Sequence, residues 1–504
     1  MKILPVDKVR EADAYTIKNE PVDSIELMER AARECFKWIY KRLKRGERVK
    51  IFCGPGNNGG DGLAVGRQLA KQGVPVEIHT LKLGGRSTAD FKTNYERLDL
   101  VGGIRVFEIT EGEAFPELED SDIIIDAIFG SGLTRPVEGL AAAVIHHINS
   151  SPGKVIAIDI PSGLFSDTCS VKHGNAIVKA DYTLSFQFPK YAFFFAENEQ
   201  FVGEWLVLPI GLHPDFIEQV AVKNFFLEQK DIFAMYEPRK KFSHKGNYGH
   251  ALLISGSYGK IGAAVMAARA ALRAGAGLVT AHVPVCGYDI LQTALPEAMV
   301  SLDDNERFFS GHPDPGLYNA IGIGPGLGTA KETATALKVL IQNSPLPLVM
   351  DADALNILGE NKTWIAFLPP NSILTPHPKE FERLAGKSGD CFERVDIQRE
   401  FAVKHQIYVV LKGAYTSICC PDGSCWFNST GNPGMATGGS GDVLTGIILG
   451  FLAQGYSPGE AALMGVYMHG LAGDYAASRL TEPAMIAGDI TEFLTRAFRD
   501  LIQK

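Results

Sequence analysis

Short runs of apolar residues alternate with longer segments of helical periodicity along the whole chain. The runs are continuous rather than alternating, which is typical of strands buried on both faces of a parallel sheet. In chain order they lie at 49–52, 76–79, 123–125, 155–158, 251–254, 278–281, 348–350 and 408–411. Because helical segments separate them, the pattern indicates βαβ units and predicts doubly wound α/β sheets.

A connector divides this pattern into two halves. His213-Pro214 follows a β-like run at 205–210, and the basic stretch Arg239-Lys240-Lys241 comes after an apolar and then charged segment. We place the boundary after residue 224. The predicted architecture is therefore two doubly wound α/β domains, a Rossmann-like domain at 1–224 and a second domain at 225–504.

The composition narrows the class of protein. Of 504 residues, 46% are hydrophobic and 21% are charged, which is typical of a folded globular protein. The formal net charge of -9 argues against nucleic acid as a partner. Residues 1–8 mix charged and apolar side chains, unlike a signal peptide, and the longest apolar run, 443–453, is too short to span a bilayer. We therefore expect a cytoplasmic protein with no membrane partner.

The 8 cysteines are scattered and do not suggest a disulfide framework. Cys419, Cys420 and Cys425 flank the turn sequence Pro421-Asp422-Gly423-Ser424. Because no fourth ligand lies at a zinc-like spacing, we expect a β-hairpin here and not a metal site.

The first half contains a glycine-rich segment, 54–62, between an apolar run and a helix expected at 63–71. Glycines let the backbone approach a ligand closely, and a helix start offers free N–H groups to anions. Asn57 and Asn58 add neutral donors and acceptors that suit a nucleotide or a weakly held cation. The segment is not a GxGxxG fingerprint, so it gives little support to a dehydrogenase.

Two other apolar runs of this half end in a carboxylate. Asp126 ends the run at 123–125 and leads into the glycine-containing segment 129–136, and Asp159 ends the run at 155–158 and leads into 160–163. In open α/β sheets, ligands bind outside the carboxyl ends of the strands. We therefore expect Asp126 and Asp159 to converge with Asn57 and Asn58.

The segments GPGNNGGDG, DAIFGSGLTRPVEG and AIDIPSGL, in this order, resemble NAD(P)HX epimerases over roughly residues 1–220. The resemblance implies that Asp159 is the acid/base residue and that Asn58, Asp126 and Ser162 bind a potassium ion. As the acid, Asp159 would need a pKa raised by burial. The implied contacts of the hydrated nicotinamide nucleotide are Asn57, Asn58, Gly59, Gly60, Asp61, Gly130, Ser131, Gly132, Leu133, Thr134, Arg135 and Pro136.

The second half contains four glycine-rich elements, at 256–262, 322–328, 412–416 and 432–442, with helices expected at 263–274 and 443–453. The fourth element holds successive glycines before a helix, which form an anion hole of backbone N–H groups for a transferring phosphoryl group. Asp442 stands at the start of that helix, where it can take a proton from an attacking hydroxyl. In the helix at 263–274, alanines spaced along one face allow close packing, which we expect against the sheet.

The GGSGD element resembles the ribokinase superfamily. The longer segments KFSHKGNYGH, DADALN, TPHPKEFERLAG, KGAYT and NPGMATGGSGDVLTG resemble the NAD(P)HX dehydratase family over roughly residues 235–500. The resemblance implies a ribokinase-like domain with Asp442 as catalytic base and ADP, with Mg²⁺, as co-substrate. Lys379 departs from the family pattern, in which Gly is common. The implied ADP contacts are Lys412, Gly413, Ala414, Tyr415, Thr416 and Gly441, and the implied hydrate contacts are Ala263, Gly326 and His377.

Together these features predict a bifunctional enzyme, an isomerase and a lyase, that repairs hydrated nicotinamide nucleotides. It would interconvert the R and S forms of NADHX and NADPHX and dehydrate the S form while ADP is converted to AMP and phosphate. The alternative is a small-molecule alcohol kinase of the ribokinase superfamily with an N-terminal nucleotide-binding module. The resemblance also leads us to expect a homo-oligomer.

Overall fold

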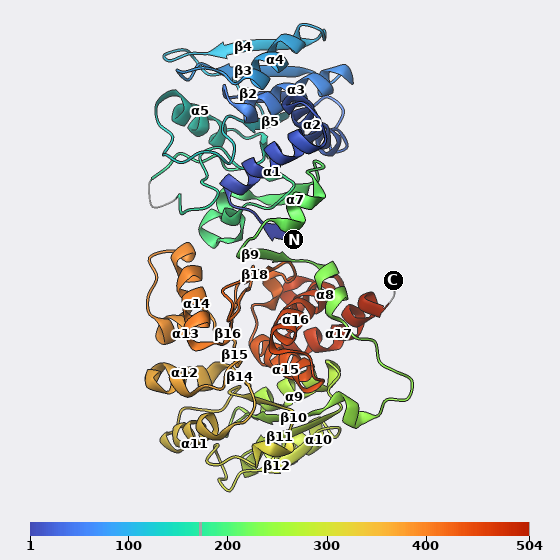
Figure 1. Cartoon of the computed structure of the whole chain (residues 1–504), viewed down its shortest axis with the longest axis vertical. Coiled ribbons are helices and arrows are strands. Elements are labelled where there is room, and N and C mark those ends of the chain that lie inside the picture. Colours follow the sequence, from blue (N-terminus) through green and yellow to red (C-terminus); the bar gives the residue numbers. More distant parts are fainter. Residues whose placement is uncertain (171–173, 503–504) are drawn as a thin grey trace. The chain divides into compact units, whose positions relative to one another are not determined.

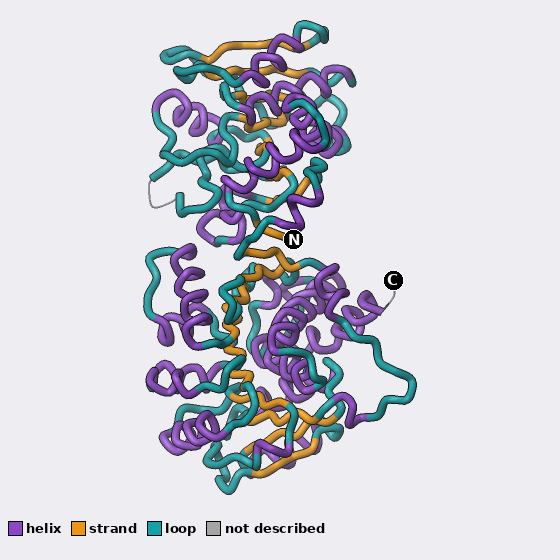
Figure 2. Tube along the Cα trace, in the orientation of Figure 1, coloured by secondary structure: helices purple, strands orange, loops and turns teal. Residues whose placement is uncertain are grey.

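The apolar runs of the sequence form strands in two largely parallel sheets (Figure 1). The computed structural model describes residues 1–170 and 174–502. The chain divides into unit 1, Met1–Val222, and unit 2, Lys223–Lys504. Each unit has its own hydrophobic core, and helices cover its sheet (Figure 2).

Unit 1 contains eight strands and seven α-helices within its described residues. The strands are β1 (Lys2–Ile3), β2 (Arg48–Cys53), β3 (Val76–Leu81), β4 (Ile104–Ile109), β5 (Asp122–Ala127), β6 (Lys154–Ile158), β7 (Tyr182–Phe186) and β8 (Glu204–Leu208). The helices are α1 (Val6–Asn19), α2 (Ser24–Tyr40), α3 (Asn57–Lys71), α4 (Ala89–Leu98), α5 (Gly139–Asn149), α6 (Glu199–Val202) and α7 (Pro214–Gln219).

The sheet of unit 1 has the order β4-β3-β2-β5-β6-β7-β8, and all its strand pairs are parallel. The chain first moves outward from β2 to β4 and then returns to place β5 on the other side of β2. The topological switch point, where ligands bind in open α/β sheets, therefore lies between β2 and β5. The segments that follow these strands begin at Gly54 and Ile128, so the glycine-rich segment and the end of the Asp126 strand meet there.

The glycine-rich segment is more helical than the sequence predicts. Helix α3 begins at Asn57 and not at residue 63. Glycine is a poor helix former, but here tertiary packing outweighs propensity. A Cβ atom on Gly59 would lie 1.8 Å from the carbonyl oxygen of Gly54, and one on Gly62 would lie 2.6 Å from the Cβ of Ala127. The glycines thus let the first turns of α3 press against the ends of β2 and β5.

Unit 2 contains a longer sheet. Its strands are β9 (Asn224–Leu227), β10 (His250–Ile254), β11 (Leu278–Val283), β12 (Met299–Leu302), β13 (Ala320–Ile323), β14 (Leu348–Met350), β15 (Ile373–Leu374), β16 (Tyr408–Leu411), β17 (Ser417–Cys419) and β18 (Cys425–Asn428). Its helices are α8 (Gln229–Met235), α9 (Ile261–Arg273), α10 (Tyr288–Ala294), α11 (Lys331–Asn343), α12 (Ala352–Glu360), α13 (Pro378–Ala385), α14 (Cys391–His405), α15 (Ser440–Ala453), α16 (Pro458–Leu480) and α17 (Ala487–Ile502).

The strands of unit 2 follow the order β9-β18-β17-β16-β15-β14-β13-β10-β11-β12. The strands from β16 to β12 pair in parallel, and the switch point lies between β10 and β13. Helices α11 to α14 cover one face of the sheet, and α15 to α17 lie on the other (Figure 1). The predicted hairpin is confirmed, because β17 and β18 are antiparallel with Cys419 opposite Cys425.

The sequence led us to expect the alanine face of α9 to pack against the sheet. Its closest packing is instead against α15. A Cβ atom on Gly446 would lie 2.1 Å from the carbonyl oxygen of Ala267, and one on Gly450 would lie 2.7 Å from that of Ala271. Small residues on both helices make this approach possible. Within the described residues, no helix is long and apolar enough to cross a membrane.

Candidate active sites

A cavity of about 530 Å³ opens at the switch point of unit 1. Its walls come from α1, from the loops after β2, β5 and β6, and from the segment that follows β7. The expected residues that line it are Asn57, Asn58, Asp61, Gly130, Ser131, Gly132, Leu133 and Asp159. Gly59 and Gly60 are buried in the packing of α3, whereas Thr134, Arg135 and Pro136 are exposed and do not belong to the cavity wall.

Asp126 and Ser162 form a buried hydrogen-bonded pair, and Asn58, which lines the cavity, is buried as well. The Ser162 hydroxyl donates to Asp126 Oδ1 at 2.6 Å, and the Ser162 backbone N–H donates to Asp126 Oδ2 at 2.7 Å. Asn58 Nδ2 donates to the carbonyl oxygen of Ile158 at 2.8 Å, while its buried Oδ1 has no hydrogen-bond donor. A buried amide oxygen without a hydrogen-bond donor fits an oxygen-ligated cation. Burial raises the pKa of Asp126 to about 6, against the opposing hydrogen bonds from Ser162.

Asp159 lies in the cavity in a strained conformation. Its φ of 67° is in the left-handed region, which is uncommon for residues other than glycine and is often found at functional sites. Its Oδ1 lies 2.7 Å from Nζ of Lys190, and both side chains are buried. The ammonium group balances the carboxylate charge and holds it in one position. Lys190, which lies within the largely aromatic stretch 186–195, was not expected from the sequence.

Two further carboxylates face this ion pair. Burial raises the pKa of Asp13, in α1, to about 6, and the negative charge of Asp159 adds to the effect. Burial also raises the pKa of Asp61 well above its ordinary value, again with a contribution from Asp159. The cavity therefore combines a carboxylate paired with a cation and two neighbouring carboxyl groups whose pKa values are raised. Such a division is what general acid and base chemistry requires.

In unit 2, Asp442 lies in the first turn of α15, as the sequence predicts. Gly439 precedes the helix with a φ of 94°, so the loop needs a glycine there to turn into the helix. Burial raises the pKa of Asp442 to about 6, with a further contribution from Asp351, while Lys412 opposes the shift. A carboxylate with this pKa is a competent proton acceptor near neutral pH.

Asp351 and Lys412 form an ion pair beside Asp442. Lys412 Nζ lies 2.8 Å from Asp351 Oδ1, and the Thr445 hydroxyl donates to Asp351 Oδ2 at 2.9 Å. A Cβ atom on Gly441 would lie 3.4 Å from both Asp351 Oδ2 and Lys412 Nζ. The ion pair therefore lies directly against the start of α15, where an anionic group is expected. Asp351 ends the run at 348–350, and its position after a strand could have identified it.

The remaining expected nucleotide contacts, Gly413, Ala414, Tyr415 and Thr416, follow β16 at the same edge of the sheet. The Thr416 hydroxyl donates to the carbonyl oxygen of Gly413 at 3.0 Å and closes this loop into a turn. Behind Ser440, His469 Nε2 lies 3.0 Å from the Ser440 carbonyl oxygen, and burial lowers the pKa of this imidazole to about 4. His469 is thus a neutral support under the start of α15.

Two of the three expected hydrate contacts meet at the switch point, because a Cβ atom on Gly326 would lie 2.9 Å from the Cβ of Ala263. His377 follows β15, two strands further along. Its Nδ1 accepts hydrogen bonds from the backbone N–H groups of Lys379 and Glu380 and caps α13. Lys379 is exposed in the first turn of α13, so its side chain does not obstruct the loop.

Both units thus place carboxylates, glycine-rich turns and a helix start at the switch point of a parallel sheet, which is the arrangement of nucleotide-handling α/β enzymes. Residues 24–192 match the family described as YjeF-related protein N-terminus, and residues 251–496 match the family described as NAD(P)H-hydrate dehydratase.

Relatives match along the whole length of the chain. The bifunctional NAD(P)H-hydrate repair enzyme of Moorella thermoacetica is 36% identical over 99% of this chain and 97% of the relative. The enzyme of the same name from Escherichia coli is 33% identical over 94% and 89%. The chain therefore belongs to the family of bifunctional NAD(P)H-hydrate repair enzymes, which confirms the predicted function and the two-domain α/β fold.

The chain is also similar, over part of its length, to a solved structure. This is the ADP/ATP-dependent NAD(P)H-hydrate dehydratase from Bacillus subtilis, co-crystallised with ATP/Mg²⁺. The match has 33% sequence identity and a TM-score of 0.49, and it covers 56% of this chain and 100% of that chain.

Proposed function

We propose that unit 1 interconverts the R and S forms of NAD(P)HX and that unit 2 dehydrates the S form, converting ADP to AMP and phosphate. The observation that carries the proposal for unit 2 is the position of Asp442 at the glycine-rich start of α15, beside the Asp351–Lys412 ion pair. For unit 1, it is the buried pair of Asp159 and Lys190 in a cavity at the switch point.

Epimerisation is a reversible loss of the ring hydroxyl as water. A carboxyl group of the cavity gives a proton to the departing hydroxyl, and the lone pair of the ring nitrogen supports the cation that remains. Asp159, paired with Lys190, lies where it can stabilise that cation and then take a proton from the water that adds to the other face. Asp13 and Asp61, whose pKa values are raised, are suited to supply the first proton.

A potassium ion in unit 1 would be held by Asn58 Oδ1, Asp126 and Ser162. The lack of a hydrogen-bond donor for Asn58 Oδ1 supports this assignment. When bound, the cation would fix the loop after β5 and draw an anionic group of the substrate toward the cavity. Asn58 and Gly130 are in close contact, since a Cβ atom on Gly130 would lie 3.3 Å from the Cβ of Asn58.

Dehydration requires conversion of a poor leaving group into a good one. Asp442 takes the proton of the ring hydroxyl, whose oxygen attacks the terminal phosphorus of ADP while the bond to AMP breaks. Backbone N–H groups at the start of α15 and the Lys412 ammonium stabilise the charge on the phosphoryl group. The ring then loses phosphate and a proton from the adjacent carbon, which restores the dihydropyridine.

Mg²⁺ would neutralise part of the phosphate charge in unit 2. Among the described residues there is no cluster of three or more His, Cys, Asp or Glu side chains that could hold a metal ion. The nucleotide phosphates and water would provide coordination there, as is common for Mg²⁺. We propose ADP with Mg²⁺ as the co-substrate pair.

The proposal is tested with the full chain, a mixture of NADHX epimers, ADP and Mg²⁺, by following the near-ultraviolet absorbance of reduced nicotinamide. Complete recovery of NADH is expected. Asp442→Asn should abolish recovery, and Asp159→Asn should stop it when the S form is exhausted. Reactions with ATP and without nucleotide serve as controls.

The outcomes separate the alternatives. An alcohol kinase would give no NADH with either nucleotide but would accumulate a stable phosphorylated product from another alcohol. Recovery by the unaltered chain that stops when one epimer is exhausted would contradict an active epimerase and leave the dehydratase in place. Undiminished recovery by Asp442→Asn would contradict the role of that carboxylate.

A further inference from the structure

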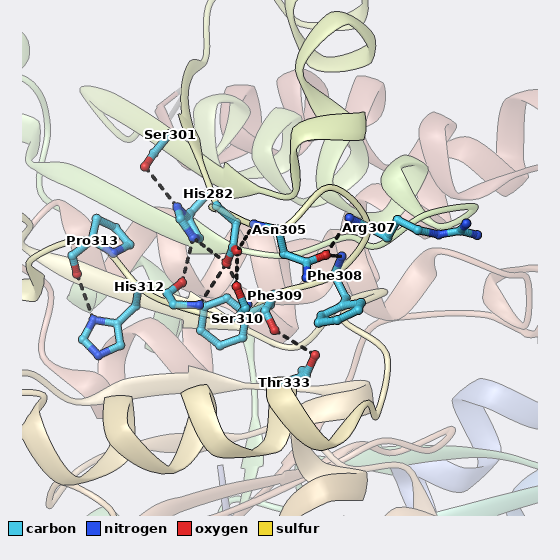
Figure 3. Close-up of polar contacts among 12 residues, drawn as sticks. His282, Ser301, Asn305, Arg307, Phe308, Phe309, Ser310, His312, Pro313 and Thr333 are labelled. Carbon is cyan, nitrogen blue, oxygen red and sulfur yellow. Dashed lines mark hydrogen bonds and ion pairs between the residues drawn. The ribbon is translucent and has the colours of Figure 1, made fainter.

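The loop that follows β12, residues 303–313, is built around a buried carboxylate. Asp303 accepts hydrogen bonds from the backbone N–H groups of Asn305, Ser310 and Gly311 at 2.8, 2.7 and 3.0 Å (Figure 3). Burial alone would raise the pKa of Asp303, but these bonds and one from the Ser310 hydroxyl outweigh it and lower the pKa. Asp303 is therefore an internal anchor for its own loop.

The loop also forms hydrogen bonds with residues of β11 and α11. His282, in β11, contacts the loop through Nε2, which lies 2.9 Å from the carbonyl oxygen of Gly311 and 3.4 Å from Asp303 Oδ2. The Thr333 hydroxyl, in α11, donates to the carbonyl oxygen of Phe309 at 2.9 Å. In Figure 3, His282 reaches the loop from above and Thr333 reaches it from below. The backbone at residues 305–308 is consequently held in a fixed position.

Arg307 extends away from this anchored cluster (Figure 3). Its guanidinium carbon lies 4.0 Å from the ring centroid of Tyr258, and the backbone N–H of Tyr258 donates to the carbonyl oxygen of Arg307 at 2.8 Å. Tyr258 is 63% exposed. Among the described residues no carboxylate forms an ion pair with Arg307, whereas Lys260, in the same loop as Tyr258, lies 3.3 Å from Asp353.

The pair stands at the edge of the sheet that carries the unit 2 site. Tyr258 follows β10, which borders the switch point, and the loop of Arg307 follows β12. Asp351, beside Asp442, follows β14, which is four strands from β12. The guanidinium of Arg307 itself lies over Tyr258, after β10, which is two strands from β14. At about 4.8 Å per strand this is roughly 10 Å, so Arg307 does not contact the reacting hydroxyl. It can therefore bind only a part of the substrate that is remote from the reacting ring.

We propose that Arg307, held on Tyr258, binds the 2′-phosphate of NADPHX and makes the dehydratase prefer NADPHX over NADHX; this inference rests on the function proposed above. A planar guanidinium has N–H groups along its edge that bind phosphate in a bidentate manner, and an aromatic ring can support its face. Because Asp303 and Tyr258 already hold Arg307 in place, little conformational entropy is lost when phosphate binds.

The test measures steady-state dehydration by the full chain with S-NADPHX and S-NADHX separately, at saturating ADP and Mg²⁺. Arg307→Ala should raise KM for NADPHX roughly ten-fold or more with kcat unchanged, and it should change KM for NADHX by less than about two-fold. Arg307→Lys, which keeps the charge and loses the planar fork, should give an intermediate KM for NADPHX. Arg496→Ala removes a comparable cation–π pair, with Tyr475, and should alter neither KM.

Equal rises in both KM values would assign Arg307 to a group common to the two substrates and overturn the inference. An unchanged KM for NADPHX would also overturn it, while the repair function would stand as long as the unaltered chain converts both substrates. Failure of the unaltered chain on both substrates would instead remove the proposed function, and this inference with it.

Discussion

At the residue scale, both sites obtain their acid–base groups by burying carboxylates beside other charges. Asp442 is half-buried, and Asp351 and Lys412 act on it with opposite signs. Burial is the larger influence and raises the pKa of Asp442 to about 6. A base acts in its ionised form, so protonation of Asp442 below this pH must stop the first step of dehydration.

We therefore expect kcat/KM of the dehydratase for NADHX to fall as the pH is lowered through about 6. Asp351→Asn should move this acidic limb to lower pH, because it removes a negative charge that raises the pKa of Asp442 and frees the Lys412 ammonium that lowers it. The measurement is the initial rate across the pH range for both proteins with the same substrates.

The phosphates of ADP also titrate in this pH range, so the acidic limb of one protein does not by itself identify Asp442. The difference in the position of the limb between the unaltered protein and Asp351→Asn does, because both proteins use the same ADP. Asp303→Asn, at a carboxylate that accepts hydrogen bonds from its own loop, serves as the control and should leave the limb in place. An identical limb in the unaltered protein and Asp351→Asn would mean that Asp442 is not the titrating base.

The sequence indicates some of these residues and not others, for a physical reason. Asp126, Asp159 and Asp442 each lie where an apolar run or a glycine-rich segment meets the next element, so local pattern identifies them. Lys190 and Asp13 lie in the segment after β7 and in α1, and only the folding of unit 1 brings them to Asp159. Their importance depends on long-range contacts that no local pattern contains.

At the element scale, glycines position the catalytic loops by permitting close backbone approach. In α3, Gly59 and Gly62 press against the ends of β2 and β5, which places Asn57, Asn58 and Asp61 on the cavity. In α15, Gly446 and Gly450 allow the helix to pack closely against the backbone of α9. These helices gain from tertiary packing what they lose in intrinsic propensity.

We expect Gly59→Ala to impair unit 1 although alanine is the better helix former. The added Cβ would lie 1.8 Å from the carbonyl oxygen of Gly54, so α3 must shift at a cost of about 1–3 kcal/mol. Asn58 would move with the helix, and epimerase activity should fall while dehydratase activity persists. The measurements are both activities and urea denaturation.

Gly488→Ala is the matched control, because a Cβ atom at Gly488, in α17, would meet nothing within 4 Å. This change should be neutral or should stabilise the protein by up to about 1 kcal/mol. Full epimerase activity in Gly59→Ala would show that the start of α3 is not held as tightly as this packing implies.

The sequence predicts those elements that have a clear local pattern of their own and misses those that do not. Buried parallel strands such as β2, β5, β10 and β16 appear as continuous apolar runs, and all are present. Strand β4 is largely exposed and mixes charged with apolar residues, and β15 spans only Ile373–Leu374, so neither gives a run of its own. The early start of α3 was missed because glycine content normally indicates a turn.

At the scale of the whole molecule, two units with separate cores carry the two sites. Each site is complete within its own unit in the contacts described above: Asp159 and Lys190 belong to unit 1, and Asp442, Asp351 and Lys412 belong to unit 2. Neither mechanism requires a residue from the other unit, so a hydrate released by one site can be used by a site on another chain.

We therefore expect two inactivated proteins to complement each other. Asp442→Asn keeps the epimerase and Asp159→Asn keeps the dehydratase, so a mixture of the two should convert an equal mixture of R-NADHX and S-NADHX completely to NADH in the presence of ADP. Asp159→Asn alone should stop after the S form. The rate of the second phase should rise in proportion to the concentration of Asp442→Asn, because epimerisation then limits recovery. If recovery by the mixture instead stops at the same point as recovery by Asp159→Asn alone, transfer of the hydrate requires both active sites on one chain. The two units would then be coupled in a way that their separate contacts do not reveal.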